Sequence, residues 1–446
     1  MSLSSANEQA PSYERPVELL QQLIRFNTTN PPGKEREGVE WIDEVLRNGG
    51  YETKILADDP ERPNLLARLE GRGEAPPLLL YGHVDVVTVE GQSWRHPPFE
   101  GKNIDGWVWG RGALDMKGGV AMMLAAFLRA KAEGLTPPGD VLLLVLSDEE
   151  SGGDYGAKYL VEEHAGLFDG VRYAISEFGG FSLYVGRRRF YPIQVAEKQV
   201  CWLRGVVRGP GGHGSLPLRG GAMAKLARLL KRLERRRLPV HVTPVARRFF
   251  ETMSAASAFP TGTILRGLLN PRLTDQTLGL LGSKGRAFDP LLHNTVAATI
   301  VRGGEKINVI PSEVTVELDG RLLPGYTPSD MIAELRRLVG EDVEFEVISH
   351  DPGPSEPDMG LFETLAGILR EADPDSLPVP LLLPAVTDAR FFSRLGVQTF
   401  GFLPMKLPAD FNFIQTIHAA DERIPAEALS FGAGAIYKAL QRFGPS

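Results

Sequence analysis

An imidazole and a carboxylate stand two positions apart at the end of an apolar run in the sequence "PPLLLYGHVDVV". These residues are His83 and Asp85, and residues two apart on an extended strand point to the same face. One interpretation is a strand-end histidine with a chance acidic neighbour. Because imidazole nitrogen and carboxylate oxygen are also metal-ligand types, the ends of the other expected strands have to be compared with this one.

Acidic side chains follow or precede three further elements of the expected fold. Glu149 and Glu150 follow the apolar run "VLLLVLSDEE", Glu177 ends "YAISE", and Asp115 stands before an expected helix in "GRGALDMKGG". Alone, each has an ordinary explanation, namely a solvated turn, a loop residue or a helix N-cap. Together, the strand ends would meet in one crevice, where clustered carboxylates repel each other unless a cation is bound. Histidine and carboxylate ligands without thiolate suit Zn²⁺, with Co²⁺ or Mn²⁺ as possible substitutes.

The elements that must position these residues alternate between strand and helix patterns in the first part of the chain. Continuous apolar strands that alternate with helices predict an α/β fold with a mostly parallel sheet covered by helices on both faces. The pattern changes near Pro192, after which the order β-α-β-β-α-β predicts a ferredoxin-like α+β domain. We therefore expect a discontinuous α/β domain (residues 1–191 and 351–446) with a smaller domain (192–350) inserted in it. Residues 241–290 interrupt the smaller domain with an insertion to which the sequence assigns no structure.

Composition limits the classes of function. A formal net charge of -7 argues against a nucleic-acid partner, for which a basic surface is expected. No apolar run approaches the roughly 20 residues of a membrane span, and the N-terminal residues show no secretory leader. The single cysteine, Cys201, lies in an alternating strand pattern and suits a reducing compartment. We expect a soluble cytoplasmic protein.

The order of the motifs resembles the M20 metallopeptidases over nearly the whole chain. The phrases are "GHVDVV", "GRGALDMKGG", "SDEESGG", "GGHGSLP", "INVIPSEVTVELDGRLLPG" and "TDARF". This family includes carboxypeptidases, aminoacylases, succinyl-diaminopimelate desuccinylases and acetylornithine deacetylases. The resemblance implies a catalytic domain that binds two Zn²⁺ ions, with the inserted domain as a lid, and a homodimer formed through that lid.

The resemblance also implies roles for the acidic and histidine residues. His83 and Glu177 would bind one zinc ion, Glu150 and His418 the other, and Asp115 would bridge the two. Asp85 would accept the second ring N–H of His83 and fix its tautomer, and Glu149 would be the general base.

Three residues of the inserted domain are further candidates. His213, which on its own reads as a loop residue among glycines, matches a family histidine that stabilises the oxyanion. Arg321, which on its own could be a surface charge at a strand end, matches an arginine that binds the substrate carboxylate. Asn308 is a further candidate for substrate contact.

The predicted function is hydrolysis of an amide or peptide bond next to a free carboxylate. The substrate would be a dipeptide, a peptide C-terminus or an N-acyl amino acid. One alternative is hydrolysis of carbamoyl, ureido or succinyl amides. The other is a catalytically silent homologue that acts as a binding protein, which would more often have lost a ligand or the base.

Overall fold

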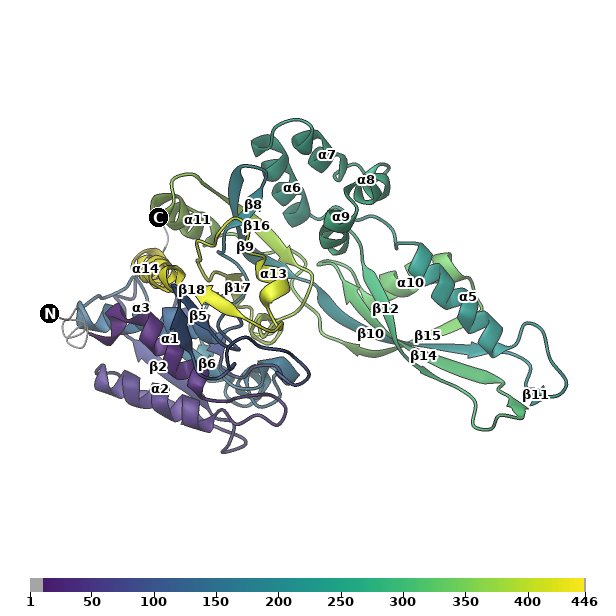
Figure 1. Ribbon diagram of the computed structural model, residues 1–446, viewed down its shortest axis with the longest axis horizontal. Helices are drawn as coiled ribbons and strands as arrows, with labels where there is room; N and C mark the ends of the chain where they lie inside the picture. Colours follow the sequence, from purple (N-terminus) through teal and green to yellow (C-terminus); the bar gives the residue numbers. More distant parts are fainter. Residues whose placement is uncertain (1–10, 445–446) are drawn as a thin grey trace. The chain divides into compact units, whose positions relative to one another are not determined.

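The computed structural model describes residues 11–444, apart from the side chains of residues 283 and 284 (Figure 1). The expectation of no secretory leader concerns residues 1–10, which lie outside the described range. The described chain forms two compact units. Unit 1 comprises residues 11–195, Asp358–Leu381 and 387–444, and unit 2 comprises Ala196–Pro357 and Leu382–Val386.

A large mixed sheet forms the centre of unit 1. Its strands, in spatial order, are β1 (Thr53–Leu56), β2 (Asn64–Leu69), β6 (Val141–Leu146), β3 (Leu78–His83), β7 (Tyr173–Ser176), β17 (Gln398–Gly401), β9 (Arg188–Glu197) and β16 (Ser376–Leu383), with β8 (Leu183–Val185) paired to β9. The four central strands, β6, β3, β7 and β17, are parallel to one another. Toward the edges, β1 pairs antiparallel with β2, β2 with β6, and β9 with β17. Residues 57–63, which join β1 to β2, are too few for the crossover that parallel pairing requires.

Helices cover both faces of this sheet, which confirms the predicted α/β class. The longer helices are α1 (Pro16–Arg25), α2 (Arg36–Asn48), α3 (Lys117–Ala132), α11 (Phe362–Ala372) and α14 (Ala426–Arg442). Helix α3 packs against β3 and β6, and α1 and α14 pack against α3. This position explains why α3 is apolar on nearly all sides, since a helix enclosed by other elements has no solvent face.

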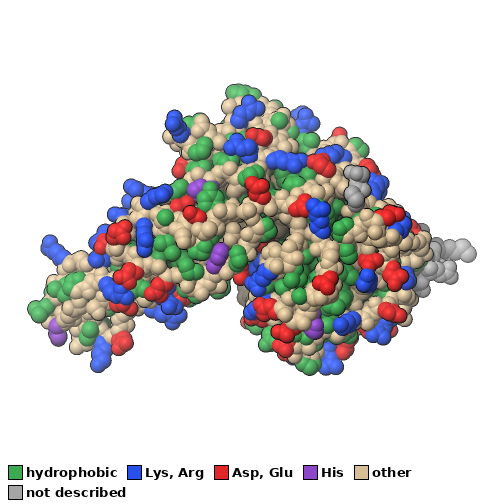
Figure 2. Space-filling view, turned by 180° about the vertical axis from the view of Figure 1, so that it is seen from behind, with side chains coloured by type: hydrophobic (Ala, Val, Ile, Leu, Met, Phe, Trp, Pro, Cys, Tyr) green, Lys and Arg blue, Asp and Glu red, His purple; other side chains and the backbone are tan. Residues whose placement is uncertain are grey.

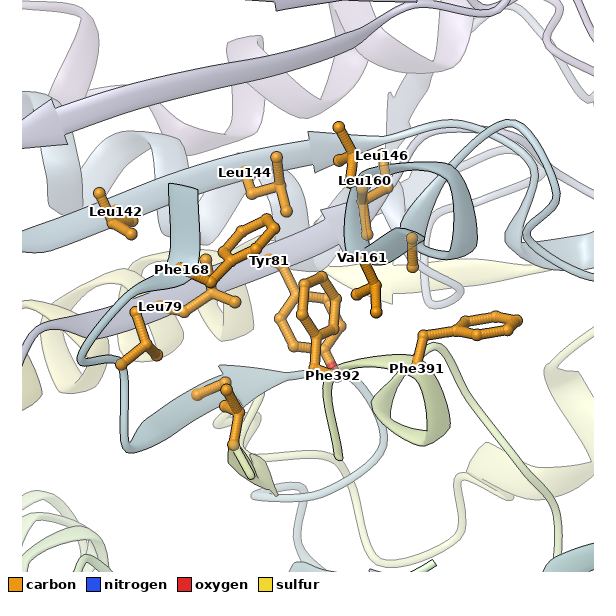
Figure 3. Packing of buried hydrophobic residues seen from close by; sticks show 14 of the residues in the cluster. Leu79, Tyr81, Leu142, Leu144, Leu146, Leu160, Val161, Phe168, Phe391 and Phe392 are labelled. Carbon is orange, nitrogen blue, oxygen red and sulfur yellow. The ribbon is translucent and has the colours of Figure 1, made fainter. Parts of the chain in front are cut away.

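On the other face, the shorter helices α4 (Ala157–Glu163) and α12 (Ala389–Ser393) enclose a second apolar cluster (Figure 3). Alternate strand residues supply one side of it, and helical residues supply the other. Its labelled members are Leu79, Tyr81, Leu142, Leu144, Leu146, Leu160, Val161, Phe168, Phe391 and Phe392. The central strands are therefore buried on both faces.

A small sheet and a short helix complete unit 1. The sheet consists of β4 (Lys102–Ile104), β5 (Trp107–Trp109) and β18 (Arg423–Pro425), and the short helix is α13 (Phe413–Thr416). The pairing of β5 with β18 brings the region of Asp115 close to the region of His418, although about 300 residues separate them in sequence.

Unit 2 contains an antiparallel sheet with two helices on one face. The sheet order is β12 (Thr295–Arg302), β14 (Glu313–Leu322), β10 (Gln199–Arg208) and β15 (Val343–His350). Helices α5 (Ala222–Arg235) and α10 (Pro328–Val339) pack on it, and the apolar core between them contains Leu203, Leu226, Val316 and Leu335. Cys201 is buried on β10, which agrees with its interpretation as a strand residue. A separate two-stranded ribbon pairs β11 (Gly212–His213) with β13 (Val309–Ile310).

The insertion at residues 241–290, unassigned from sequence, is helical. It forms α6 (Pro244–Ala256), α7 (Thr261–Gly267), α8 (Thr274–Leu281) and α9 (Ser283–Phe288), which lie together in Figure 1. Thr243 accepts a hydrogen bond from the backbone N–H of Ala246, and Pro244 is the first helical residue. This cap and proline are a helix-start signal that the surrounding turn residues obscured.

Charged side chains of both signs are interspersed on the face that Figure 2 shows. Among the residues that the structure describes, we find no helix long and apolar enough to cross a membrane.

Candidate metal centre

The three strands whose ends carry the candidate residues are neighbours in the sheet. Strand β3 ends at His83, which lies opposite Leu146 of β6, and β7 pairs with β3 on its other side. Since the strands are parallel, the residues that follow them meet at one edge of the sheet. Glu149 and Glu150 begin a single turn of 3₁₀-helix after β6, and Glu177 follows β7 directly.

A first group of polar atoms surrounds His83, whose side chain is 1% exposed. Its Nε2 atom lies 3.2 Å from Oδ1 of Asp115, 3.7 Å from Oε2 of Glu177 and 4.0 Å from Oε2 of Glu149. Single atoms of His83, Glu149 and Glu177 lie within 4.8 Å of one another, which is compatible with a shared cation. The three residues come from three different strand ends.

A second group forms around His418, which adopts a left-handed backbone conformation with φ of 60°. Its Nε2 atom lies 3.1 Å from Oδ2 of Asp115 and 3.2 Å from Oε1 of Glu150. The two oxygens of Asp115 therefore face different imidazoles, Oδ1 toward His83 and Oδ2 toward His418. One carboxylate thus connects two groups of ligand-type atoms, each with its own histidine and its own glutamate.

The charges of this centre perturb one another strongly. Burial, followed by the negative charge of Glu177, raises the pKa of Glu149 well above its ordinary value. Burial also raises the pKa of Glu177, to about 7, although His83 opposes the shift. Hydrogen bonds to Asp115 and Glu150 raise the pKa of His418 to about 10. For His83, burial favours the neutral ring, but hydrogen bonds to neighbouring carboxylates outweigh it and raise the pKa.

These residues fit a pair of divalent cations by the chemistry of their donor atoms. Four carboxylates, those of Asp115, Glu149, Glu150 and Glu177, surround two imidazoles, so ionisation of all four leaves negative charge in excess even when both rings are protonated. Bound cations would remove this excess and keep the carboxylates ionised. Nitrogen and oxygen donors without thiolate suit Zn²⁺, Co²⁺ or Mn²⁺.

Asp85 lies beneath the centre and contacts three of its residues. Nδ1 of His83 lies 3.0 Å from the backbone oxygen of Asp85 and 3.3 Å from its Oδ1 atom. The same carboxylate accepts the backbone N–H groups of Glu149, at 3.1 Å, and Glu150, at 3.0 Å. Asp85 therefore contacts the ring of His83 and also fixes the turn that carries the two glutamates.

Two residues that support the centre were not identified from sequence. Glu422 accepts the backbone N–H groups of Leu114, at 2.8 Å, and Asp115, at 3.2 Å. Arg111 donates to Glu422 at 2.7 Å and to the backbone oxygen of His418 at 3.2 Å, and both charged side chains are fully buried. The only sequence signal is their position, since Arg111 lies four residues before Asp115 and Glu422 four residues after His418.

The three remaining candidates lie in unit 2. His213 is on β11 and Asn308 is beside β13, and the backbone N–H of Gly214 donates to the oxygen of Asn308 at 2.7 Å. The structure therefore brings His213 and Asn308 together on one ribbon. Nδ1 of His213 accepts the backbone N–H of Ser215 at 3.2 Å, so the ring proton of the neutral form is on Nε2. Arg321 lies on β14 and forms an ion pair with Asp319 at 2.7 Å.

Comparisons with known proteins identify the family. The model of peptidase family M20/M25/M40 matches residues 79–442. The chain is 30% identical over 363 residues to a probable carboxypeptidase S-like 2 of Dictyostelium discoideum, covering 78% of this chain and 68% of that protein. It is also 30% identical over 433 residues to an N-fatty-acyl-amino acid synthase/hydrolase of Xenopus tropicalis, covering 93% and 83%.

A solved structure shows the same fold. It is an M20 family metallo-carboxypeptidase from Sulfolobus solfataricus, with a TM-score of 0.67, 15% identity, and coverage of 96% of this chain and 99% of that one. The family match, the relatives and this likeness agree with the cluster of ligand-type side chains at the sheet edge. The chain belongs to peptidase family M20/M25/M40, whose members are metal-dependent hydrolases, and it is one of them.

Proposed function

We propose that the protein is a dinuclear zinc hydrolase that cleaves an amide or peptide bond next to a free carboxylate, with Glu149 as the general base. The observation that carries this proposal is the position of Asp115 between two imidazoles, at 3.2 Å from His83 and 3.1 Å from His418. A carboxylate whose two oxygens face separate ligand groups can contact both ions of a two-metal site.

Each proposed metal ion has its own set of ligands. His83 and Glu177 would hold one ion, His418 and Glu150 the other, and Asp115 would contact both. Bound there, two zinc ions would polarise the substrate carbonyl and lower the pKa of a water molecule. Asp85, which lies against Nδ1 of His83, would fix the ring tautomer so that Nε2 is the ligand atom.

Glu149 is the carboxylate that remains once these ligands are assigned. Its Oε2 atom faces Nε2 of His83 at 4.0 Å, so it lies at the edge of the ligand group. From there it would accept a proton from the attacking water and donate it to the leaving nitrogen.

Substrate binding is assigned to unit 2. The Nε2–H of His213 would donate to the oxyanion, and the guanidinium of Arg321 would bind the substrate carboxylate. Asn308, on the same ribbon as His213, would contact the substrate through its amide. The names of two relatives, a carboxypeptidase and an N-fatty-acyl-amino acid synthase/hydrolase, support peptides and N-acyl amino acids as the substrate class.

We further propose a cytoplasmic homodimer formed through unit 2. Strand β12 is an edge strand of the unit 2 sheet, and its residues from Ala297 to Arg302 are exposed. An exposed edge strand can pair with a second copy of the chain. Sedimentation at several protein concentrations tests the dimer, and a variant with Ile300→Lys on β12 should shift it toward the monomer.

The experiment that tests the proposed chemistry compares Glu149→Gln with the native enzyme on dipeptides and N-acyl amino acids, each also prepared as its C-terminal amide. We expect hydrolysis of the free acids only, and a loss of about 100-fold or more in kcat for Glu149→Gln with both metal ions retained. Glu163→Gln, at an exposed position of the same unit, is the matched control and should keep full activity. Full activity of Glu149→Gln would contradict the mechanism, and equal rates for acids and amides would contradict the substrate class.

A further inference from the structure

Behind the strand ends lies a buried polar cluster in which no residue is a proposed metal ligand. Its members, here called the support cluster, are Asn30, Glu35, Arg62, Asp85 and Asp148, and each is at most 6% exposed. Three of the five are carboxylates, and one is the only cation. Such a group is costly to bury unless its polar atoms are well paired, so its contacts indicate what it holds in place.

Asn30 is the link between two of these carboxylates. Its Nδ2 atom donates to Oδ2 of Asp85 at 2.8 Å and to Oδ1 of Asp148 at 3.0 Å. A primary amide offers two N–H groups on one nitrogen and carries no charge, so it can join two carboxylates without adding to either charge. The backbone of Asn30 is itself fixed to the strand end, because its N–H donates to the oxygen of Val86 at 2.9 Å.

Each carboxylate that Asn30 joins controls the turn after β6. Asp85 accepts the backbone N–H groups of Glu149 and Glu150. Asp148, the residue just before them, has a left-handed backbone with φ of 73°, a conformation that is uncommon for residues other than glycine but that aspartate adopts more readily than most. Its Oδ2 atom accepts the backbone N–H of Tyr155 at 3.0 Å, so the side chain closes the turn on itself.

Arg62 and Glu35 hold the far side of the support cluster. Nη2 of Arg62 lies 2.9 Å from Oδ1 of Asp148 and 2.9 Å from Oε1 of Glu35. The guanidinium packs so closely against Gly33 that a Cβ atom there would lie 2.4 Å from it. Asp148 is therefore fixed from two directions, by Arg62 and by Asn30.

We propose that Asn30 is a positioning residue for the base and for one metal ligand, which rests on the proposed roles of Glu149 and Glu150. By locking Asp85 to Asp148, the amide of Asn30 sets the direction in which the turn presents these two glutamates. Asn30 touches no metal ligand side chain in the contacts described above. Its effect passes through Asp85 and the backbone of the turn.

Removal of the Asn30 amide should therefore lower kcat or zinc affinity more than removal of a buried amide far from the turn. We expect Asn30→Ala to reduce kcat or zinc affinity by about 10- to 100-fold, the usual effect of losing a partner that orients metal ligands. Asn30→Asp places a third carboxylate against Asp85 and Asp148. It should reduce kcat or zinc affinity more than Asn30→Ala does. Asn30→Ser keeps one donor instead of two, so its loss of kcat or zinc affinity should be smaller than that of Asn30→Ala. It serves as the test variant where the other variants fold poorly.

The matched control is Asn294→Ala in unit 2. Asn294 is also buried and also bridges a carboxylate and the backbone, since it donates to Glu334 at 3.2 Å and accepts from Leu323 at 2.8 Å. Both alanine variants should lose stability in urea. Only the Asn30 variants should lose kcat at saturating zinc, or zinc affinity measured by competition with a chelating dye.

The outcomes separate this inference from the proposed function. A loss of at least tenfold in kcat or zinc affinity for Asn30→Ala, absent from Asn294→Ala, supports the inference. The inference is overturned when kcat and zinc affinity of Asn30→Ala both stay within about twofold of the native values. It is also overturned when Asn30→Ala and Asn294→Ala lower these two quantities equally. A native enzyme that hydrolyses none of the substrates contradicts the proposed function instead, and zinc affinity then still tests the positioning role.

Discussion

Replacement of Arg111 by methionine should destabilise unit 1 more than any surface substitution. Methionine keeps the apolar stem of the side chain but removes the guanidinium. The guanidinium pairs with Glu422 at 2.7 Å and donates to Gln92 at 2.8 Å and to the backbone oxygens of His418 and Ala419 at 3.2 Å each. Without it, Glu422 remains as a carboxylate in a site with no solvent exposure.

The expected magnitude follows from this burial. Loss of one partner of a buried ion pair costs about 3 to 5 kcal/mol, because the other charge stays desolvated and unpaired. Glu422 keeps its two backbone donors, from Leu114 and Asp115, so we expect the lower end, about 3 kcal/mol. With a urea slope of about 3 kcal/mol per molar for a unit of this size, the unfolding midpoint should fall by about 1 M.

Tryptophan fluorescence during urea unfolding measures this change. Four of the five tryptophans are in unit 1, at positions 41, 94, 107 and 109. Trp94 lies 5.2 Å from the guanidinium of Arg111 and reports on the site directly. The control is Glu422→Gln in two backgrounds. It should lower stability in the native chain, where it leaves Arg111 unpaired, and raise it in Arg111→Met, where it removes the unpaired charge.

Two results would refute this reasoning. One is a midpoint within about 0.3 M of the native value for Arg111→Met, given the slope assumed above. The other is an equal loss from Glu422→Gln in both backgrounds, which would mean that the two side chains are not coupled.

Three other predictions concern Lys198, Gly153 and Gly214, none of which is a proposed metal ligand. Burial lowers the pKa of Lys198 to about 7. Between about pH 7 and 10.5 the unfolded chain therefore binds more protons at this residue than the folded chain does. The free energy of unfolding should rise over this range by up to about 1.4 kcal/mol per pH unit. Lys198→Met should reduce the difference in unfolding free energy between pH 7 and pH 9, and an unchanged difference would contradict this assignment. Gly153→Ala should lower the free energy of unfolding in urea by about 1 to 3 kcal/mol, because φ of Gly153 is 80° and a Cβ atom would lie 2.8 Å from the Phe391 ring. An unchanged free energy of unfolding would refute the predicted clash. Gly214→Val should lower kcat by about tenfold through the orientation of His213, because a Cβ would lie 3.1 Å from the backbone of Asn308, and unchanged kinetics would argue against the oxyanion role.

The strand-end residues could be identified from sequence because their positions depend on local patterns. His83, Glu149 and Glu177 each follow an apolar run, and parallel strands align their carboxyl ends. His418 has no such signal. It follows α13, a helix of only four residues, and was identified only through the family resemblance.

Contacts between distant parts of the chain could not be predicted. Arg111 pairs with Glu422 across 311 positions, and Asn30 donates to Asp148 across 118. No periodic pattern in one sequence specifies such pairs, because they depend on the topology that brings β5 beside β18 and the first loop beside β3. The helices at residues 241–290 escape prediction for another reason, since turn residues separate them and α7, α8 and α9 are too short for a clear helical periodicity.

The most direct test of the account is a zinc titration of the metal-free protein, with hydrolysis of an N-acyl amino acid and bound zinc measured on the same samples. Two groups of ligands that share Asp115 predict that activity and bound metal both saturate at about two zinc ions per chain, and that Asp115→Ala impairs both sites together. Full activity at one zinc ion per chain, or an Asp115→Ala variant that still binds two ions with native affinity, would contradict a bridged dinuclear centre.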